Sequence, residues 1–402
     1  MQRSPLDGLT VLDLTIWQNG PWATVMLSDM GANIIKIEDP EKGDPGRNMA
    51  AMGANATRKI SHYFQTMNRN KRSMTLNLKN PEGKKLFLEM AKKADIVVQN
   101  FRVGVVEKLG VDYESVKKVN PKIIYASVSG FGPKGPDAKD GVFDILGQGR
   151  GGLLWLLNLG EAEPVYRSYA GLADQTGAIT LAYGLLLAII ARERYGVGQH
   201  MQTSQLGGQL MLQALALNGF LMNGDLPPAR PRTNSGNPLF NIYKCGDGKW
   251  IALGCVQSDR WWPGVCNAMG LQDMKDDPRY ATMGERSKNC VEVIKVLDKT
   301  FATKPREEWL KLLKAETVIC GAVQSYDDIP KDPQVIANDY LTTVTHPVHG
   351  VLREVGVPVK LSETPGYART AAPEFGEHTE VILQEFGFNW EQIAKLREQG
   401  AI

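Results

Sequence analysis

Short apolar runs alternate with helix-like segments along the first half of the chain. The runs predicted to be strands are 10–14, 33–37, 73–78, 95–98 and 122–128, and the segments with helical spacing are 23–30, 81–94 and 103–119. Strands that alternate with helices favour a parallel sheet covered on both faces. The predicted fold class is therefore α/β, with a Rossmann-like parallel-sheet large domain.

Residues 170–200, AGLADQTGAITLAYGLLLAIIARERYGVGQH, form the longest apolar segment and begin with small residues around Asp174. The apolar run is shorter than the ~20 residues of a membrane span, and it contains Thr180, Tyr183 and Gly184. It predicts a core helix with an acid at its start, and no membrane segment.

Asp174 is the acid around which the predicted chemistry is organised. Free backbone N–H groups and the positive end of the helix dipole stabilise a carboxylate at a helix start, so it can stay ionised in partly apolar surroundings. An N-cap is the structural alternative, because aspartate is among the best N-cap residues. The neighbouring Gly171 and Ala173 leave room for a bulky ligand, which favours a functional role.

The pattern changes after residue 224. A Pro-, Gly- and Asn-rich stretch, 224–238, precedes a predicted hairpin and then helices. The elements expected from there on are strands 240–243 and 250–253, helices 259–269, 285–302 and 306–315, strands 342–344 and 351–355, and a helix at 390–398. We divide the chain into 1–224, the N-terminal part of the large domain; 225–328, a linker and a smaller α+β domain; and 329–402.

Composition narrows the class of protein. The length of 402 residues suggests two or three domains. The chain has 46 basic and 44 acidic side chains, and this near balance does not indicate a nucleic-acid-binding protein. The five cysteines are dispersed without a C-x-x-C pair, which is typical of reduced thiols in a cytoplasmic protein and indicates neither disulfides nor a metal site. The N-terminal segment lacks the apolar core of an export signal.

A βαβ unit invites a nicotinamide or flavin cofactor, because Glu38 and Asp39 follow the second predicted strand where a ribose could be held. The first strand–helix turn, IWQNGPWA, has a single Gly20 followed by Pro21. It does not provide the close backbone approach that a pyrophosphate needs. We expect no permanently bound cofactor.

Motifs spread over the whole chain resemble the class III CoA-transferases, the family of formyl-CoA and crotonobetainyl-CoA transferases. The resemblance rests on the order and spacing of PLDGLTVLDL, GANIIKIEDPEKGDPGR, NRNKRSMTLNLKNPEG, ADIVVQNFRVGVVEKLGVDY, NPKIIYASVSGFGPKGP, FDILGQGRGGL, ADQTGA with ARERYGVGQH, LREVGVPVKLSETP and FGEHTEVILQEFG. It implies a large domain built from both ends of the chain, a small domain inserted between them, and an intertwined homodimer.

The resemblance implies that Asp174 is the catalytic aspartate. Its carboxylate would form a mixed anhydride with the acyl group of an acyl-CoA and then an aspartyl-CoA thioester, which an organic acid discharges. Coenzyme A and acyl-CoA are then substrates, with succinyl-CoA or acetyl-CoA as the expected donor. Gln18 matches a family glutamine that can donate to the developing oxyanion, and its alternative role is to satisfy backbone groups in the turn.

Family positions that contact CoA also carry over. They are Leu76, Lys79, Asn100, Phe101, Lys108 and Leu109, with Arg72 and Arg102 as neighbouring candidates. Asn234, Ser235, Gly236 and Asn237 occupy the place of a glycine-rich loop that covers the active site in some members, here with one glycine. A surface lysine considered singly is more often only a solvated side chain.

Two alternatives remain open. An α-methylacyl-CoA racemase binds CoA but needs an acid/base pair, and Phe143, where related racemases carry a histidine before Asp144, cannot exchange a proton. The chain could instead be one subunit of a hetero-oligomeric CoA-transferase. Residues 153–158 with Trp17, Trp22 and Tyr166 could line a pocket for a bulky or aromatic acid, or simply pack a core.

Overall fold

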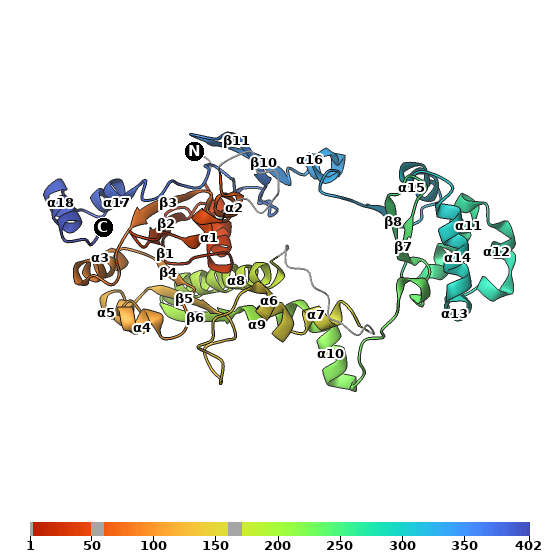
Figure 1. The fold of residues 1–402 in the computed structure, drawn as a ribbon, viewed down its shortest axis with the longest axis horizontal. Coiled ribbons are helices and arrows are strands. Elements are labelled where there is room, and N and C mark those ends of the chain that lie inside the picture. The colour runs from red at the N-terminus through yellow and green to blue at the C-terminus, as the bar shows by residue number, and fades with distance from the viewer. Residues whose placement is uncertain (1–2, 50–59, 160–170) are drawn as a thin grey trace. The chain divides into compact units, whose positions relative to one another are not determined.

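The computed structural model describes residues 3–49, 60–159 and 171–402. The chain divides into two units, one of residues 1–157, 164–224 and 337–402 and a smaller one of residues 158–163 and 225–336. Figure 1 shows both units.

The larger unit contains a six-stranded parallel sheet in the order β3-β2-β1-β4-β5-β6. Its strands are β1 (Thr10–Asp13), β2 (Asn33–Glu38), β3 (Lys71–Thr75), β4 (Ile96–Gln99), β5 (Ile124–Ser129) and β6 (Gln199–Ser204). The predicted α/β class and the first five strands are confirmed. The sixth, QHMQTS, was missed because it has no apolar run. The order of strands reverses between β1 and β4, the place where open α/β sheets bind ligands.

Helices surround this sheet. They are α1 (Asn19–Asp29), α2 (His62–Asn68), α3 (Pro81–Ala91), α4 (Val105–Leu109), α5 (Tyr113–Val119), α6 (Asp144–Arg150), α7 (Leu153–Leu156), α8 (Leu172–Tyr195), α9 (Gln205–Leu212) and α10 (Ala214–Asn223). α1 begins before the predicted residue 23, because Pro21 fits the first turn of a helix, where no N–H is needed. The helix predicted at 103–119 is divided by Gly110, whose φ is 69°.

The C-terminal segment of the larger unit adds an antiparallel pair, β10 (Leu341–His346) and β11 (Gly350–Val355), and the helices α17 (Thr379–Glu385) and α18 (Trp390–Glu398). The helix α16 (Pro333–Ala337) spans the boundary in sequence: residues 333–336 are assigned to the smaller unit and residue 337 to the larger. Both predicted strands and the final helix are confirmed.

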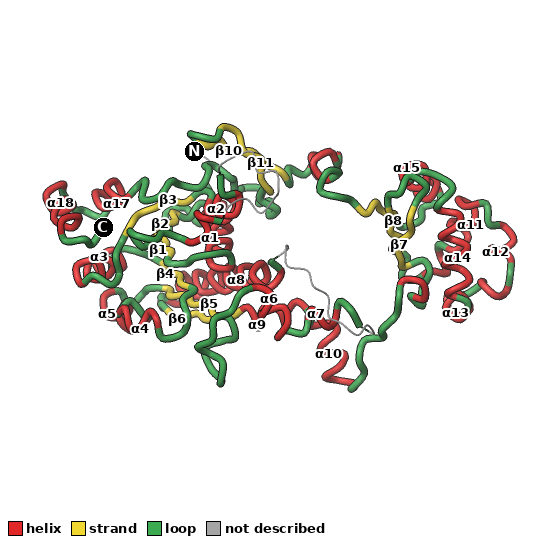
Figure 2. The backbone as a smooth tube through the Cα atoms, viewed as in Figure 1, coloured by secondary structure: helices red, strands yellow, loops and turns green. Residues whose placement is uncertain are grey.

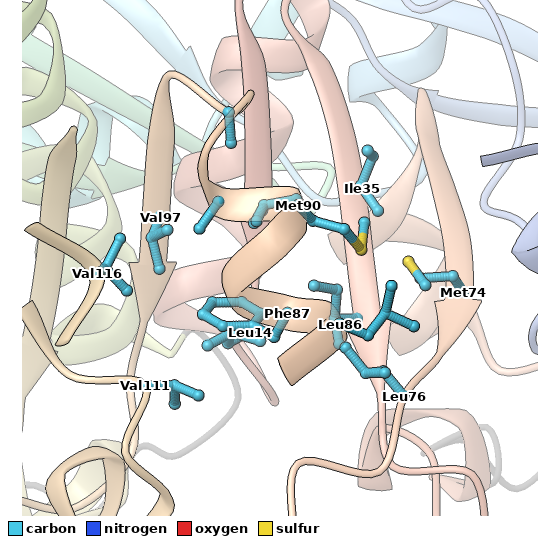
Figure 3. Packing of buried hydrophobic residues seen from close by; sticks show 14 of the residues in the cluster. Leu14, Ile35, Met74, Leu76, Leu86, Phe87, Met90, Val97, Val111 and Val116 are labelled. Carbon is cyan, nitrogen blue, oxygen red and sulfur yellow. The ribbon is translucent and has the colours of Figure 1, made fainter. Parts of the chain in front are cut away.

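The two faces of the sheet are packed separately, because successive side chains of a strand point to opposite faces. Leu12 joins a cluster with Phe87 and Met90 of α3, which Figure 3 shows from close by. Val11 joins another with Leu181 of α8. In Figure 1, α3, α17 and α18 lie on one side of the sheet, and α1 and α8 lie on the other.

Only one face of α8 is packed in the core. Its 24 residues make it long and apolar enough, by length and composition, to cross a membrane, so the length argument from sequence was wrong. In its most apolar window, 44% of the residues are buried, on the face that packs against α1 and the sheet. A core helix of a soluble protein can meet the same criterion of length and hydropathy. On its other face Ile179, Tyr183 and Ile190 are exposed.

The smaller unit has a three-stranded antiparallel sheet in the order β7-β8-β9, with helices packed against one side of it (Figure 2). The strands are β7 (Phe240–Lys244), β8 (Trp250–Gly254) and β9 (Cys320–Val323), and the helices are α11 (Trp262–Met269), α12 (Gln272–Asp276), α13 (Met283–Lys288), α14 (Cys290–Phe301) and α15 (Arg306–Ala315). The predicted hairpin is confirmed. The five cysteines all lie in this unit as free thiols.

Short 3₁₀ helices complete the described elements. They are η1 (Pro45–Asn48), η2 (Arg232–Asn234), η3 (Ser258–Arg260), η4 (Pro278–Tyr280) and η5 (Ile329–Lys331).

Candidate active site

A cavity of about 360 Å³ lies in the larger unit and contains the Asp174 carboxylate. Its walls come from the segments that follow β1, β4 and β5, from α2, and from the starts of α8 and α9. The lining residues used below are Ile16, Trp17, Tyr63, Asn100, Phe101, Arg102, Asp140, Gly141, Val142, Phe143, Asp174 and Gln205. The position matches the crevice expected where the strand order reverses.

Asp174 lies in the first turn of α8, but it does not cap the helix. Gly171, with φ 57°, is the N-cap residue and has no side chain to offer. Oδ1 of Asp144 instead accepts hydrogen bonds from the backbone N–H groups of Ala173, at 2.7 Å, and Asp174, at 3.1 Å. The N-cap alternative for Asp174 is therefore wrong. Asp144 takes the amide groups that a catalytic carboxylate would otherwise use.

The charge state of Asp174 also differs from the expectation. Burial and, second, the neighbouring Asp144 carboxylate raise the pKa of Asp174 to about 7, while the hydrogen bond from Gln205 lowers it. The helix start does not keep this acid fully ionised near neutral pH, because burial and the neighbouring Asp144 carboxylate disfavour its charged form. An acid with a strongly raised pKa in a cavity is a candidate for chemistry.

Gln205, at the start of α9, was not singled out from the sequence. Its Nε2 donates a hydrogen bond to Oδ1 of Asp174. Within the described residues, Oδ2 of Asp174 has no hydrogen-bond partner, and neither does the buried Oε1 of Gln205. One carboxylate oxygen is therefore held and the other is available to a ligand in the cavity.

Gln18 lies beside the start of α8. Its side-chain amide is packed against Gly171, where any Cβ would collide with it. Glycine is thus required at position 171 both for its positive φ and for this close approach. The structure brings the predicted Gln18 next to the residue that opens the helix of Asp174, although Gln18 is not among the cavity-lining residues.

Two buried ion pairs lie next to the turn that follows β1. Nζ of Lys71 is 3.0 Å from Oδ2 of Asp13, and Nζ of Lys36 is 2.7 Å from Oδ2 of Asp44, all four side chains being almost inaccessible to solvent. Burial lowers the pKa of Lys71 to about 8. Burial opposes ionisation of Asp13, yet Lys71 and Lys36 hold its pKa below the ordinary value.

These buried groups fix the turn after β1 residue by residue. Lys36 donates to the carbonyl of Thr15 at 2.9 Å. Asn100 accepts from Ile16 N–H at 2.9 Å and donates to its carbonyl at 2.7 Å. The N–H of Trp17 donates to Asp44 at 3.3 Å. The turn is held by contacts from Lys36 in β2, Asn100 just after β4 and Asp44 just before η1, all of them distant from the turn in sequence.

Trp17 has a φ of 65°, in the left-handed region that bulky residues avoid at a cost of about 1–3 kcal/mol. Its ring meets Tyr63 edge to face at 6.5 Å and Phe143 at 5.7 Å. Burial, with the carboxylates of Asp174, Asp44 and Asp144, raises the pKa of Tyr63, so its hydroxyl stays protonated. We call Trp17, Tyr63 and Phe143 the aromatic wall.

Three of the predicted CoA contacts lie together in the cavity: Asn100, Phe101 and Arg102, which follow β4. The Arg102 guanidinium lies against Gly141, and any side chain at position 141 would displace it. Within the described part of the chain it has no carboxylate partner. It is therefore available to an anionic ligand.

The other predicted CoA contacts lie elsewhere. Leu76 is buried in the core, and Leu109 is partly buried against the same cluster. Lys79 is exposed and 3.6 Å from Asp39. Arg72 is held by both oxygens of Glu385. Lys108, on α4, is exposed. Their contact with CoA stays a prediction.

The predicted covering loop, Asn234 to Asn237, belongs to the smaller unit. Asn237 donates to the carbonyls of Cys255 and Val256, Ser235 donates to that of Asn237, and Gly236 has a φ of 81°. The Asn237 side chain thus connects the loop to residues 255 and 256. The role of the loop as a lid stays a prediction.

The residues suggested for a bulky acid separate. Trp17 lines the cavity, whereas Trp22 packs against the guanidinium of Arg69 and Trp155 of the 153–158 segment is half exposed. Tyr166 lies outside the described residues, as does Ala170 at the start of the α8 segment. Within residues 3–49, 60–159 and 171–402, no group of three His, Cys, Asp or Glu side chains is arranged to hold a metal ion.

Comparison with known protein families assigns the chain. The model of CoA-transferase family III matches residues 6–379. The chain belongs to CoA-transferase family III. As a class III CoA-transferase it is an enzyme of acyl-CoA metabolism, and the resemblance inferred from its motifs is confirmed.

Curated relatives of this class III CoA-transferase match along most of their length. An acyl-CoA transferase of Fusarium pseudograminearum is 33% identical, with 100% of this chain and 89% of the relative covered. An acetyl-CoA:oxalate CoA-transferase of Acetobacter aceti is 32% identical, with 96% of each covered. A formyl-CoA:oxalate CoA-transferase of Bradyrhizobium diazoefficiens is 31% identical, with 99% and 97% covered.

Solved structures agree with this assignment. A CaiB/BaiF family protein from Brucella suis has a TM-score of 0.84 and 27% identity, covering 96% of this chain and 100% of its own. A protein from Mycobacterium tuberculosis has a TM-score of 0.81 and 27% identity, covering 95% and 99%.

Proposed function

We propose that this class III CoA-transferase moves coenzyme A from an acyl-CoA donor to an organic acid by covalent catalysis at Asp174. The observation that carries the proposal is the placement of Asp174, whose Oδ2 has no hydrogen-bond partner among the described residues, in the same cavity as Asn100, Phe101 and Arg102. A nucleophile and a candidate anchor for the CoA phosphates thus share one space.

In the first half-reaction, the free oxygen of Asp174 attacks the thioester carbonyl carbon of the donor. A C–O bond forms, the C–S bond breaks, and CoA leaves as a thiolate, giving a mixed anhydride. The thiolate then attacks the aspartyl carbonyl carbon. A C–S bond forms there, the anhydride C–O bond breaks, and the donor acid leaves as a carboxylate.

The second half-reaction runs the same steps in reverse order with another acid. The acceptor carboxylate attacks the aspartyl thioester, and CoA thiolate is released as a new anhydride forms. The thiolate attacks the acceptor's acyl carbon, and Asp174 returns as a carboxylate. No proton is gained or lost in either half, so the chemistry needs a carboxylate but no general acid.

Each tetrahedral intermediate carries an oxyanion. Gln18 is proposed to stabilise it as an amide donor, supported by its packing against Gly171 at the start of α8. Gln205 is proposed to hold the non-attacking oxygen of Asp174 in place, supported by the hydrogen bond to Oδ1. The two amides then act on different oxygens.

CoA binding is proposed to begin at Arg102, because guanidinium groups bind phosphates through paired hydrogen bonds. Its lack of a carboxylate partner among the described residues supports this role. Lys79 and Lys108 are proposed as further cations along the exposed surface, with Leu76, Leu109 and Arg72 as the weakest of the carried-over contacts. Acetyl-CoA or succinyl-CoA is the proposed donor.

The assembly proposed is an intertwined homodimer. The apolar residues Ile179, Tyr183 and Ile190 exposed on α8 support a covered face. Sedimentation at micromolar concentration tests it: a monomer contradicts the proposal, and activity that appears only after adding a related chain favours a hetero-oligomer. The cytoplasm is the proposed compartment.

The deciding experiment measures intact protein mass after incubation with acetyl-CoA or succinyl-CoA, before and after treatment with hydroxylamine, which displaces CoA from an aspartyl thioester and leaves a hydroxamate on the same residue. A CoA-sized adduct on wild-type protein, mapped to Asp174 and absent from Asp174→Ala, is expected. Asp140→Ala is the matched control, because Asp140 lines the same cavity. An adduct that persists in Asp174→Ala contradicts the proposal. Exchange of an α-proton in deuterated water without any adduct favours the racemase instead.

A further inference from the structure

We propose that the acid that accepts CoA from this enzyme carries an apolar branched or aromatic chain, and that Trp17 is the residue that selects it. The inference rests on the proposed function, since it concerns the acyl group that meets Asp174. It names a substrate class that differs from oxalate, the acid after which the relatives from Acetobacter aceti and Bradyrhizobium diazoefficiens are named.

The first argument is the shape and polarity of the cavity beside Asp174. The aromatic wall has three rings in edge-to-face contact, and Ile16 and Val142 extend its apolar surface. Phe143 is 60% exposed, although it is a large apolar side chain inside a cavity. Apolar surface that folding leaves open favours an apolar ligand, because binding removes it from water.

The second argument is charge. Asp140 and Asp174 contribute two carboxylates to the cavity, and Asp144 lies directly behind Asp174. Arg102 is the one cation among the lining residues that the structure describes, and it is assigned to CoA. Lys36 and Lys71 are already paired with buried acids. Among the described lining residues, the second carboxylate of oxalate or succinate would therefore face like charge and find no counterion other than Arg102.

The third argument is the backbone of Trp17. A bulky residue with a φ of 65° is unusual, and the turn around it is fixed by Lys36, Asn100 and Asp44. This fixed turn aims the indole into the space between Tyr63 and Phe143. Glycine or asparagine would satisfy the backbone with less strain, so the large ring itself is what the site requires.

One consequence concerns the donor. Both donor and acceptor acyl groups must occupy the same space beside Asp174. Acetyl-CoA, which carries no second carboxylate, is therefore favoured over succinyl-CoA.

The experiment is a panel of acceptor acids, offered to enzyme loaded with CoA at Asp174. The panel is oxalate, succinate, acetate, isovalerate and phenylacetate, and kcat/KM is measured for each. Isovalerate and phenylacetate are expected to exceed oxalate and succinate by about 10-fold or more, as apolar pockets discriminate on that scale. Oxalate or succinate as the best acceptor overturns the proposal.

Two variants test Trp17 itself. Trp17→Gly suits the backbone and removes the ring, and it is expected to lower kcat/KM for phenylacetate by about 10-fold while changing that for acetate less than about 3-fold. Trp17→Phe is expected to restore most of the preference. Trp390→Val, an exposed tryptophan on α18, is the control and is expected to change neither value. Equal losses for every acid in Trp17→Gly overturn the assignment.

The loading step separates the two proposals. If no adduct forms on Asp174 with either donor, the proposed function fails. If the adduct forms and is discharged best by a dicarboxylate, only the substrate class fails.

Discussion

The side-chain amide of Gln205 donates a hydrogen bond to Oδ1 of Asp174 from 31 residues away in the sequence. The contact joins the starts of α8 and α9, and it leaves Oδ2 of Asp174 as the oxygen that would attack in the proposed mechanism. It also stabilises the charged form of an acid whose burial and whose neighbour Asp144 disfavour ionisation. Gln205 is therefore a positioning residue with two measurable effects.

Gln205→Met is expected to lower kcat by about 10- to 100-fold with little change in the KM for acyl-CoA, because the amide orients the nucleophile and does not touch CoA. The acidic limb of the kcat profile is expected to move to higher pH, since the lost hydrogen bond favours the carboxylate. Steady-state kinetics from pH 5 to 9 measures both. The fold should tolerate the change, because Oε1 of Gln205 is already unpartnered in the described structure. A loss of kcat with no movement of the limb contradicts the second effect.

Activity is expected to fall as the pH drops through about 7, the pKa of Asp174, because only the carboxylate attacks. Asp144→Asn removes the neighbouring charge that raises this pKa, so its acidic limb is expected about one unit lower. The asparagine oxygen can still accept from the N–H groups of Ala173 and Asp174. A profile that does not move would show that Asp174 is not the titrating group.

The same raised pKa predicts how stability depends on pH. Between the ordinary aspartate value and about 7, the native state binds a proton that the unfolded state has lost, so the free energy of unfolding falls as the pH rises through this window. Asp174→Asn removes the penalty. It is expected to raise Tm at pH 8 by roughly 2–5 °C and to have little effect at pH 4. Calorimetry at the two pH values measures the difference, and an equal shift at both contradicts the linkage.

Gly171 and Gly196 form a matched pair, because they lie at the two ends of α8 with φ values of 57° and 70°. Gly196→Ala meets no atom within 4 Å, so it carries only the cost of a left-handed alanine, roughly 1 kcal/mol, and activity is expected to remain. Gly171→Ala also displaces Gln18 and is expected to lower kcat by about 10-fold or more. Equal activities would remove Gln18 from the proposed mechanism.

Lys36 holds the turn after β1 through its hydrogen bonds to Asp44 and to the carbonyl of Thr15. Lys36→Met leaves a buried, unpaired Asp44 and is expected to lower the free energy of unfolding by roughly 3–5 kcal/mol. Lys79→Met breaks an exposed pair with Asp39 and is expected to change it by less than about 1 kcal/mol. Urea titrations of both variants measure the contrast. Similar small losses would mean that the buried network does not support the turn.

The sequence by itself determined the parts of this protein that depend on local pattern. Five strands of the parallel sheet were visible as apolar runs, and the small-residue start of α8 marked Asp174. Motif order along the chain determined the family. β6 was not predicted, because its six residues are mostly polar and lie half-buried or exposed at the edge of the sheet.

Only the tertiary structure decided the surroundings of Asp174. Asp144, Gln205 and Tyr63 reach it from separate segments, and no local periodicity links them. The charge of Asp174 was predicted from its helix start alone, whereas in the folded chain Asp144 occupies those amide groups. The reason is physical: a helix start is a local property, but desolvation and like charge arise from groups that folding brings together.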